Sequence, residues 1–96
     1  MPTYIGLLNY TQKGMADMPN SSSRIEASRQ RIAESGGELK GYYLTMGQYD
    51  AVVIVDMPSD EALAKLLLAL GASGLYTTQT MRAFTLEEAK GIFDSL

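Results

Sequence analysis

Runs of hydrophobic residues that are apolar at both odd and even positions dominate this chain. The clearest run, residues 51–55 (AVVIV), lies between a glycine-containing turn and Pro58. Valine and isoleucine are stiff at χ1 and suit a pleated sheet. A strand that is apolar at both parities requires cover on both faces. The pattern therefore predicts a central β-strand rather than part of a buried helix.

Three more strands follow from the same pattern. Residues 3–10 (TYIGLLNY) predict a second central strand, in which Gly6 marks a bulge or a close backbone approach. Residues 75–84 (LYTTQTMRAF) are threonine-rich and amphipathic. Residues 38–45 form a hairpin with the valine-rich run around the loop 46–49. With Thr45 opposite Asp50, one face of the hairpin carries Leu39, Tyr43, Val52 and Ile54, and the other carries Tyr42, Leu44, Val53 and Val55.

The first predicted helix follows a long connection. Residues 11–20 (TQKGMADMPN) have no clear period and predict a loop, which is either a surface excursion or a lid whose Met15 and Met18 cover a pocket. Residues 23–26 (SRIE) have the pattern of a capping box that opens the helix. The pair at 36–37 (GG) supplies the left-handed residue that ends it. Its narrow apolar stripe predicts a position on the surface.

Two more helices are predicted in the second half of the chain. Ser59 is the expected N-cap of the first, with acidic residues in its first turn. Residues 62–70 (ALAKLLLAL) are apolar nearly all round, which predicts burial on more than one side. Residues 85–88 (TLEE) form another capping box and open a short helix that runs to about residue 96.

This order of elements predicts one α+β domain over residues 1–96, a ferredoxin-like βαββαβ fold with a short C-terminal helix. Both main helices then cover one face of an antiparallel four-stranded sheet. We expect the bare face to be apolar and to carry two or more of Tyr4, Leu8, Tyr10, Tyr42 and Tyr43. An apolar patch of that size marks an interface. The pattern therefore predicts a homodimer, possibly of higher order, built by sheet packing; the alternative is that the last helix folds across the bare face.

Composition excludes several chemistries. The chain has no cysteine and no histidine, so disulfides, zinc–thiolate sites, iron–sulfur clusters, Ser-His-Asp catalysis and His-ligated haem are excluded. Any acid–base catalysis would therefore use Asp, Glu, Lys or Tyr side chains. There is no glycine-rich phosphate loop and no metal-ligand spacing, so we expect no cofactor and no metal.

Charge and hydropathy argue against some classes of binding partner. A net charge of −3 argues against nucleic acid, which requires a basic face. No apolar run approaches 18 residues, so no membrane span is expected. The N-terminus lacks the basic region of a signal peptide. These features fit a cytoplasmic protein.

Several side chains are candidates for binding a ligand. Tyr49 and Asp50, after Gly47, either complete the hairpin turn or point into a pocket as hydrogen-bond donor and base. Arg82 either pairs with a strand carboxylate (Asp50 or Asp56) or binds an anion through its fork of donors.

Further candidates lie near the predicted long loop and on the sheet. Arg24 sits where a helix begins and an anion can bind, although a solvated face with local ion pairs explains most such arginines. Tyrosines on a sheet are more often core or interface residues than catalysts. Tyr10, Tyr43 and Tyr49 remain the candidates for a pocket that holds an aromatic or quinone-like molecule.

The arrangement of these pieces resembles the GYD-domain family. The likeness rests on residues 47–50 (GQYD) after the 36–37 glycine pair, the valine-rich strand, Pro58 and the closing residues 82–84 (RAF), and it covers nearly the whole chain. It implies a dimeric α+β barrel. Relatives in that wider group include small-molecule monooxygenases, haem-binding degradation enzymes and stress-response proteins, and the resemblance assigns no catalytic residue here.

Three functional hypotheses follow. The first is a cytoplasmic homodimer that binds a small organic ligand between sheet and loops. The second is a cofactor-independent enzyme, of monooxygenase or isomerase type, that acts on an activated aromatic compound. The third is a pure assembly module, for which the apolar helix at residues 62–70 provides a second interface.

Overall fold

A computed structural model describes all residues 1–96 and confirms the predicted fold. The strands are β1 (Thr3–Tyr10), β2 (Glu38–Leu44), β3 (Ala51–Asp56) and β4 (Tyr76–Ala83). The helices are α1 (Gln12–Ala16), α2 (Ser21–Glu34), α3 (Asp60–Ala72) and α4 (Leu86–Asp94), with a 3-10 helix, η1 (Met18–Asn20). The four-stranded antiparallel sheet has the order β2-β3-β1-β4, which places β1 and β3 in the centre as predicted.

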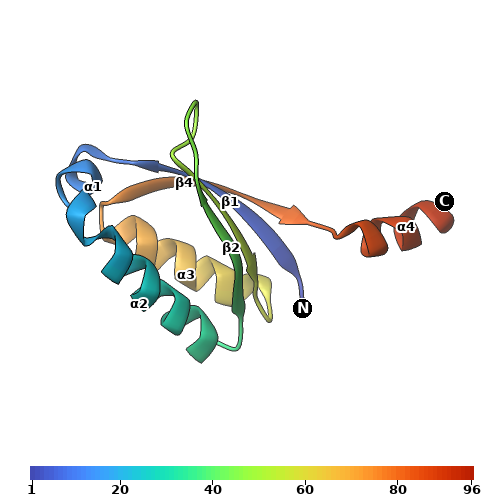
Figure 1. The fold of residues 1–96 in the computed structure, drawn as a ribbon. Coiled ribbons are helices and arrows are strands. Elements are labelled where there is room, and N and C mark those ends of the chain that lie inside the picture. The colour runs from blue at the N-terminus through green and yellow to red at the C-terminus, as the bar shows by residue number, and fades with distance from the viewer.

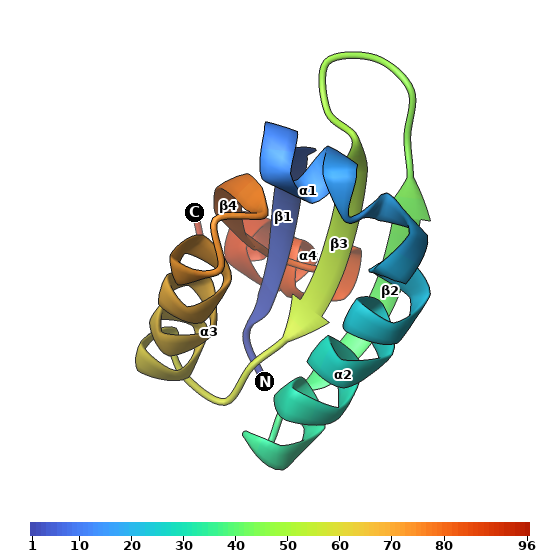
Figure 2. The same cartoon turned by 90° about the vertical axis from the view of Figure 1, so that its left-hand side faces the viewer.

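Helices α2 and α3 cover one face of the sheet (Figures 1 and 2). The core lies between them and the strands, where Tyr4, Ile32, Val55, Met57 and Leu63 are buried together. Only 8 of the 96 residues are buried in the single chain. A core this small is what a sheet covered on one side alone produces, so much apolar surface remains outside it.

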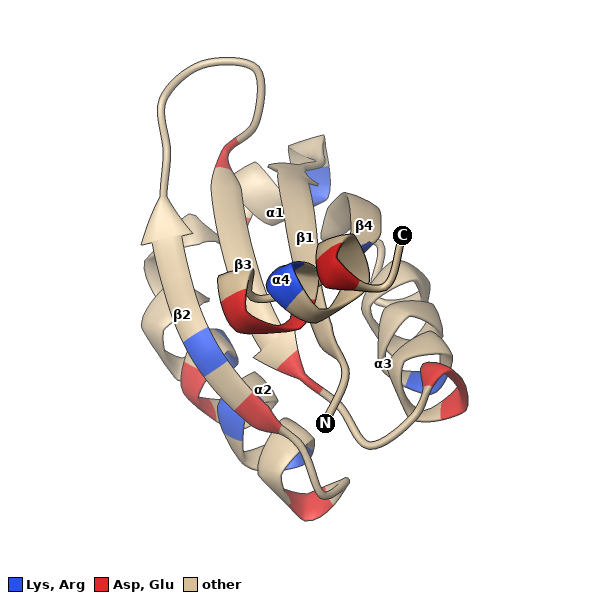
Figure 3. Cartoon of the chain, turned by 90° about the vertical axis from the view of Figure 1, so that its right-hand side faces the viewer, with Lys and Arg blue, Asp and Glu red and all other residues tan.

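The face of the sheet opposite α2 and α3, which we call the bare face, differs in its members from the expectation. Tyr4, Leu8, Tyr10 and Tyr42 all lie on the helix-covered face, and only Tyr43 of the five expected side chains lies on the bare face. The apolar members of the bare face are Ile5, Leu7, Tyr43, Val52, Ile54 and Met81. Figure 3 looks onto this face, where few charged residues appear on the strands. The inferred apolar character is therefore correct, but it rests mainly on aliphatic side chains.

A β-bulge also corrects the predicted faces of the hairpin. The register shifts between Leu39 and Gly41, because Lys40 is an extra residue in β2. The hairpin tip has the predicted register, and Thr45 N–H donates to Asp50 O at 2.8 Å. Beyond the bulge, Leu39 lies opposite Val55 and joins the helix-covered face rather than that of Val52. No bulge occurs at Gly6, where the pairing of β1 is continuous.

Residues 11–20 are helical rather than a loop. Thr11 caps α1 by accepting from Gly14 N–H at 3.1 Å, and η1 follows directly. Helix α2 then begins at Ser21 with Asn20 as its N-cap, three residues before the predicted N-cap Ser23, and the expected capping box at residues 23–26 does not form. The end of α2 is as predicted, with Gly36 at a φ of 86°.

The two C-terminal helices differ in their surroundings. Ser59 caps α3 as predicted, but α3 is not buried on more than one side, since the side chain of Leu68 is 75% exposed. The capping box of Thr85 and Glu88 opens α4 as predicted. Helix α4 projects away from the body on the side of the bare face and does not lie across it (Figure 1). No helix is long and apolar enough to cross a membrane.

Candidate functional site

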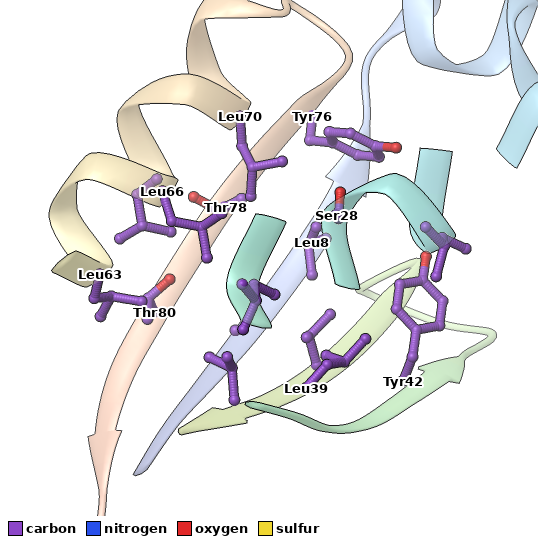
Figure 4. Close-up of a pocket in the computed structure, with 16 residues that line it drawn as sticks. Leu8, Ser28, Leu39, Tyr42, Leu63, Leu66, Leu70, Tyr76, Thr78 and Thr80 are labelled. Atoms are coloured by element: carbon purple, nitrogen blue, oxygen red, sulfur yellow. The ribbon is translucent and has the colours of Figure 1, made fainter. Parts of the chain in front are cut away.

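A cavity of about 80 Å³ lies between the sheet and helices α2 and α3. Twelve of its 16 lining residues are hydrophobic, among them Leu8, Ile32 and Leu63. A water molecule takes up about 30 Å³ in the liquid, so the cavity has room for roughly two to three water-sized groups. Figure 4 shows these side chains converging from the strands and the two helices.

The fold creates this space through the placement of its helices. Helix α2 packs against β2, and α3 packs against β4, so the two helices lie over opposite edges of the same face of the sheet (Figure 2). Between them, Gly6 occupies the centre of the sheet without a side chain, and it pairs with Thr80. A β-carbon at Gly6 would lie 3.8 Å from Thr80 Oγ1. The missing side chain therefore leaves the threonine facing open space.

Thr80 is the most unusual polar group at this cavity. Its Oγ1 is buried and has no hydrogen-bond partner in the protein. Buried hydroxyl groups are nearly always hydrogen-bonded, because leaving one unpaired costs about 1–3 kcal/mol. In Figure 4 Thr80 lies at the leucine-rich end of the cavity, beside Leu63.

Two tyrosines, Tyr42 and Tyr76, line the opposite end of the cavity, and Tyr10 lies against both. The hydroxyls of Tyr10 and Tyr42 lie 3.1 Å apart, and the rings of Tyr10 and Tyr76 are 5.3 Å apart. Tyr42 and Tyr76 line the cavity, and Figure 4 shows both hydroxyls at this end. Burial raises the pKa of both Tyr42 and Tyr76. Both phenols therefore stay neutral at pH 7 and act as hydrogen-bond donors or acceptors.

Arg24 lies beside this tyrosine cluster. Its guanidinium carbon is 5.4 Å from the centre of the Tyr76 ring, a cation–π distance. Its Nε is 3.2 Å from Asp17 Oδ2, close enough for a charge pair but without hydrogen-bond alignment. Two predicted site residues, Tyr10 and Arg24, thus lie against Tyr76, but neither is among the residues that line the cavity.

The candidate residues of the hairpin, Tyr43, Tyr49 and Asp50, are not among the residues that line the cavity. Tyr43 is 59% exposed on the bare face. Tyr49 donates its hydroxyl to Gln79 Oε1 at 2.6 Å, and Gln79 belongs to that face as well. Asp50 Oδ2 accepts the Tyr10 N–H at 2.9 Å, and Gly47 has a φ of 133°. These contacts fit the turn-forming interpretation of the GQYD segment.

Arg82 lies at the far end of β4 from Tyr76. None of the three ion pairs of the chain involves it, so the predicted pairing with Asp50 or Asp56 does not form. Its guanidinium carbon lies 4.4 Å from the Phe84 ring centre and 5.7 Å from that of Tyr4. The hydrogen bond from Tyr4 to Asp60, with burial, raises the pKa of Tyr4.

Sequence reasoning did not select Tyr42, Tyr76 or Thr80 as site residues. Their signal in the sequence is weak, because tyrosines and threonines are ordinary residues of strands. Pairing shows that Tyr42 shares a face with Val53, and that Thr80 shares the same face with Gly6. No group of three or more acidic, histidine or cysteine side chains is placed to hold a metal ion.

One protein family and several solved structures are similar to this chain over most of its length. The family model described as "GYD domain" matches residues 4–93. The structure of TTHA0845 from Thermus thermophilus is 25% identical, with a TM-score of 0.54, and the match covers 88% of this chain and 95% of that one. No curated protein matches the sequence.

Another similar structure has a bound ligand. The 5-chloro-2-hydroxyhydroquinone dehydrochlorinase TftG from Burkholderia phenoliruptrix AC1100, in complex with 2,5-dihydroxybenzoquinone, is 12% identical with a TM-score of 0.62. That match covers 91% of this chain and 97% of TftG. TTHA0845 and TftG are dimeric α+β barrel proteins, so the likeness confirms the fold class predicted from the element order.

Proposed function

This chain belongs to the GYD domain family, and from the cavity within its fold we propose that it is a homodimer that binds a small organic ligand between the sheet and helices α2 and α3. The ligand has an apolar body, which fills the leucine-rich part of the cavity. It carries one polar group that pairs with Thr80 and another that reaches the tyrosine cluster.

The unpaired hydroxyl of Thr80 is the observation that carries this proposal. An apolar cavity by itself is only a packing defect, and such cavities stay dry. Here Thr80, one of the lining residues, has a buried hydroxyl with no partner in the protein. A ligand that offers a hydrogen-bonding group at that point removes the cost of the unpaired hydroxyl. Ligand sites combine mainly apolar walls with a few polar groups in this way.

The size of the cavity limits the ligand to a single ring. A dry apolar cavity of about 150 Å³ binds benzene, so a ring in this cavity of about 80 Å³ requires the lining side chains to move outward. TftG, which shares the fold, was crystallised with 2,5-dihydroxybenzoquinone, a ring of that size. Single-ring phenols are therefore the first probes to use.

The residues that line the cavity favour ligand binding over catalysis. No Asp, Glu, Lys or Arg is among the lining residues. A tyrosine would have to ionise to act as a base, and burial raises the pKa of Tyr42 and Tyr76. General-base catalysis near pH 7 requires a pKa near that value.

Titration of phenol into the full-length protein, followed by two-dimensional NMR, tests this proposal. We expect saturable shifts at residues of the cavity. Thr80→Val keeps the shape and removes the hydroxyl, so it should weaken phenol binding about tenfold, the cost of one lost hydrogen bond. Thr77→Val, on the exposed opposite side of the same strand, is the matched control and should bind phenol like the wild type.

The stability of Thr80→Val separates a ligand-binding role from a structural one. Removing an unpaired buried hydroxyl should leave the midpoint of unfolding unchanged or raise it. A midpoint that drops by several degrees would show that the protein itself uses this hydroxyl. The absence of shifts with any single-ring phenol would contradict the proposal as a whole.

The homodimer is supported by the bare face, which the single chain leaves uncovered. The bare face carries six apolar side chains, of which Tyr43 and Met81 are about half exposed, at 59% and 49%. Helix α4 projects from the body on the same side, so it does not shield this face (Figures 1 and 3). Patches of this kind mark interfaces, and a second copy with its sheet placed face to face would cover it.

A further inference from the structure

We propose that helix α4 of each copy in the dimer packs its apolar stripe against the hairpin tip of the other copy. The hairpin tip is residues 44–49 (LTMGQY), at the turn between β2 and β3. This inference rests on the proposed function, since it starts from the face-to-face homodimer and assigns the direction of its twofold axis and a second contact.

Helix α4 lacks a partner within its own chain. It has nine residues, and a helix this short is marginal in water unless it packs against something. No strand or other helix packs extensively against it. Its large apolar side chains recur on one side of the helix and are all exposed: Leu86, Ile92, Phe93 and, just beyond its end, Leu96. Such an amphipathic helix requires an apolar surface from another molecule.

The hairpin tip is the second segment with uncovered apolar side chains. Met46 is 98% exposed and Leu44 is 76% exposed. No charged residue occurs from Gly41 to Tyr49, although turns are normally polar. A β-carbon added at Gly47 would meet no atom within 4 Å, so the tip stands clear of the chain around it. Exposed methionine and leucine without nearby charge form a surface suited to apolar contact.

These two segments flank the bare face at opposite ends of the sheet. The tip continues β2 and β3 beyond the end where Leu8 pairs with Ala51, and α4 follows the end where Thr3 pairs with Ala83. In Figure 1 the tip rises at the top and α4 extends to the right, with the bare face between them. A second copy seated on the bare face therefore lies between the tip and α4.

Symmetry limits the contacts that this second copy can make. A face-to-face dimer has its twofold axis in the plane between the sheets, and the axis runs either across the strands or along them. An axis across the strands places the α4 end of one sheet over the tip end of the other. Each α4 then meets the partner's tip, and the same contact forms twice. An axis along the strands places like ends together, with α4 beside α4.

Charge favours the axis across the strands. Helix α4 carries three acidic residues, Glu87, Glu88 and Asp94, against the single Lys90. Two such helices side by side would repel each other, since like charges at an interface are unfavourable. The uncharged tip accepts an acidic helix without this repulsion. This axis therefore covers both apolar segments and keeps the acidic helices apart.

Chemical crosslinking between two single-cysteine variants tests the inference, because the chain has no cysteine of its own. Unlabelled Met46→Cys and isotope-labelled Phe93→Cys are mixed in urea, refolded together and treated with a short bismaleimide. Intact mass then separates mixed dimers from dimers of one variant. We expect crosslinked mixed dimers to exceed either like-with-like dimer at least tenfold. Leu68→Cys, on the exposed side of α3, is the control and should crosslink with neither variant.

Sedimentation velocity provides a second, independent measurement of the same contact. Phe93→Ser should raise the dissociation constant of the dimer at least tenfold, because it removes the largest side chain of the stripe. Asp94→Ser, which lies off the stripe, is the matched control and should leave the constant within about twofold of the wild type. Adding Met46→Ser to Phe93→Ser should weaken the dimer little further, because both changes remove one contact.

Each result has a distinct meaning. Predominant like-with-like crosslinks would show that the axis runs along the strands, which overturns this inference while the dimer stands. A dimer without crosslinks that Phe93→Ser does not weaken would assign α4 to another partner and overturn it as well. A wild type that is monomeric at all concentrations would contradict the homodimer of the proposed function together with this inference. If Phe93→Cys does not refold, Leu96→Cys on the same stripe replaces it.

Discussion

Individual tyrosines determine much of the polar character of the covered face. Burial raises the pKa of Tyr42 and Tyr76, and a hydrogen bond to Asp60 together with burial raises that of Tyr4. A tyrosine whose pKa is raised by folding stabilises the native state fully below its unfolded pKa of about 10. This stabilisation is lost as the pH rises through the folded pKa, because the native state must then ionise a buried phenol.

We predict that urea denaturation at pH 8 to 11 will show stability falling steeply above about pH 10. Tyr42→Phe should cost about 1 kcal/mol at pH 8, because the hydrogen bond with Tyr10 is lost. It should also make the decline above pH 10 shallower than in the wild type. Tyr43→Phe is the comparison variant, because Tyr43 lies on the bare face, away from Tyr10 and Tyr42. Parallel declines in Tyr42→Phe and wild type would contradict the role of Tyr42.

At the scale of elements, the local sequence determines where a helix begins if an N-cap residue is followed by an apolar stripe. Ser59 accepts from Ala62 N–H at 3.1 Å and begins α3, and Thr85 with Glu88 forms the capping box of α4. The serine at 23 has an equally good sequence pattern but lies inside α2. The chain before it is already helical, because α1 and η1 lead directly into α2.

Two serine substitutions distinguish a real cap from an apparent one. Ser59→Ala should lower the free energy of unfolding by about 1 kcal/mol, the usual loss for an N-cap. Ser23→Ala should leave it unchanged or raise it slightly, because alanine is the better residue inside a helix. Thermal and urea unfolding of both variants gives the comparison. A loss with Ser23→Ala equal to that with Ser59→Ala would place the start of α2 where the sequence pattern placed it.

At the scale of the whole molecule, the single chain is an open structure with three uncovered apolar surfaces. These surfaces are the bare face, the exposed side of α3 around Leu68, and the stripe of α4, whose Phe93 is 63% exposed. The bare face is the broadest, because it spans all four strands. The exposed side of α3 keeps open the hypothesis of a second interface.

We predict that Leu7→Glu, in the middle of the bare face, will convert a dimer into a monomer. A carboxylate there would be buried without a partner when two sheets pack together. Leu68→Glu is the control on the exposed side of α3 and should leave the dimer intact. Sedimentation velocity at several concentrations gives the subunit count of each variant.

The opposite pattern in that experiment would assign the interface differently. Monomers from Leu68→Glu together with dimers from Leu7→Glu would place the contact on α3 and overturn face-to-face sheet packing. Loss of species larger than a dimer in Leu68→Glu alone would favour the assembly hypothesis as an addition to the dimer.

The sequence by itself determined the strands, three of the helices, their order and the fold class. These features depend on neighbouring residues: β-branched runs favour extended backbone, caps fix helix ends, and a short hairpin fixes its own register. In the GQYD segment, Gly47 has the positive φ that the turn-forming alternative requires. Residues 11–20 were mispredicted, because their helical turns depend on contacts with a distant segment, such as that of Thr11 with Gly74.

Only the tertiary structure decided which side chains meet. The extra residue at Lys40 moved Leu39 to the other face of β2, a change that no periodicity reveals. Thr80 and Gly6 face each other through strand pairing, and Arg24 reaches Tyr76 across more than half of the chain. Local preferences act over a few residues, whereas the cavity and the unpaired hydroxyl of Thr80 arise from segments that become neighbours only when the chain folds.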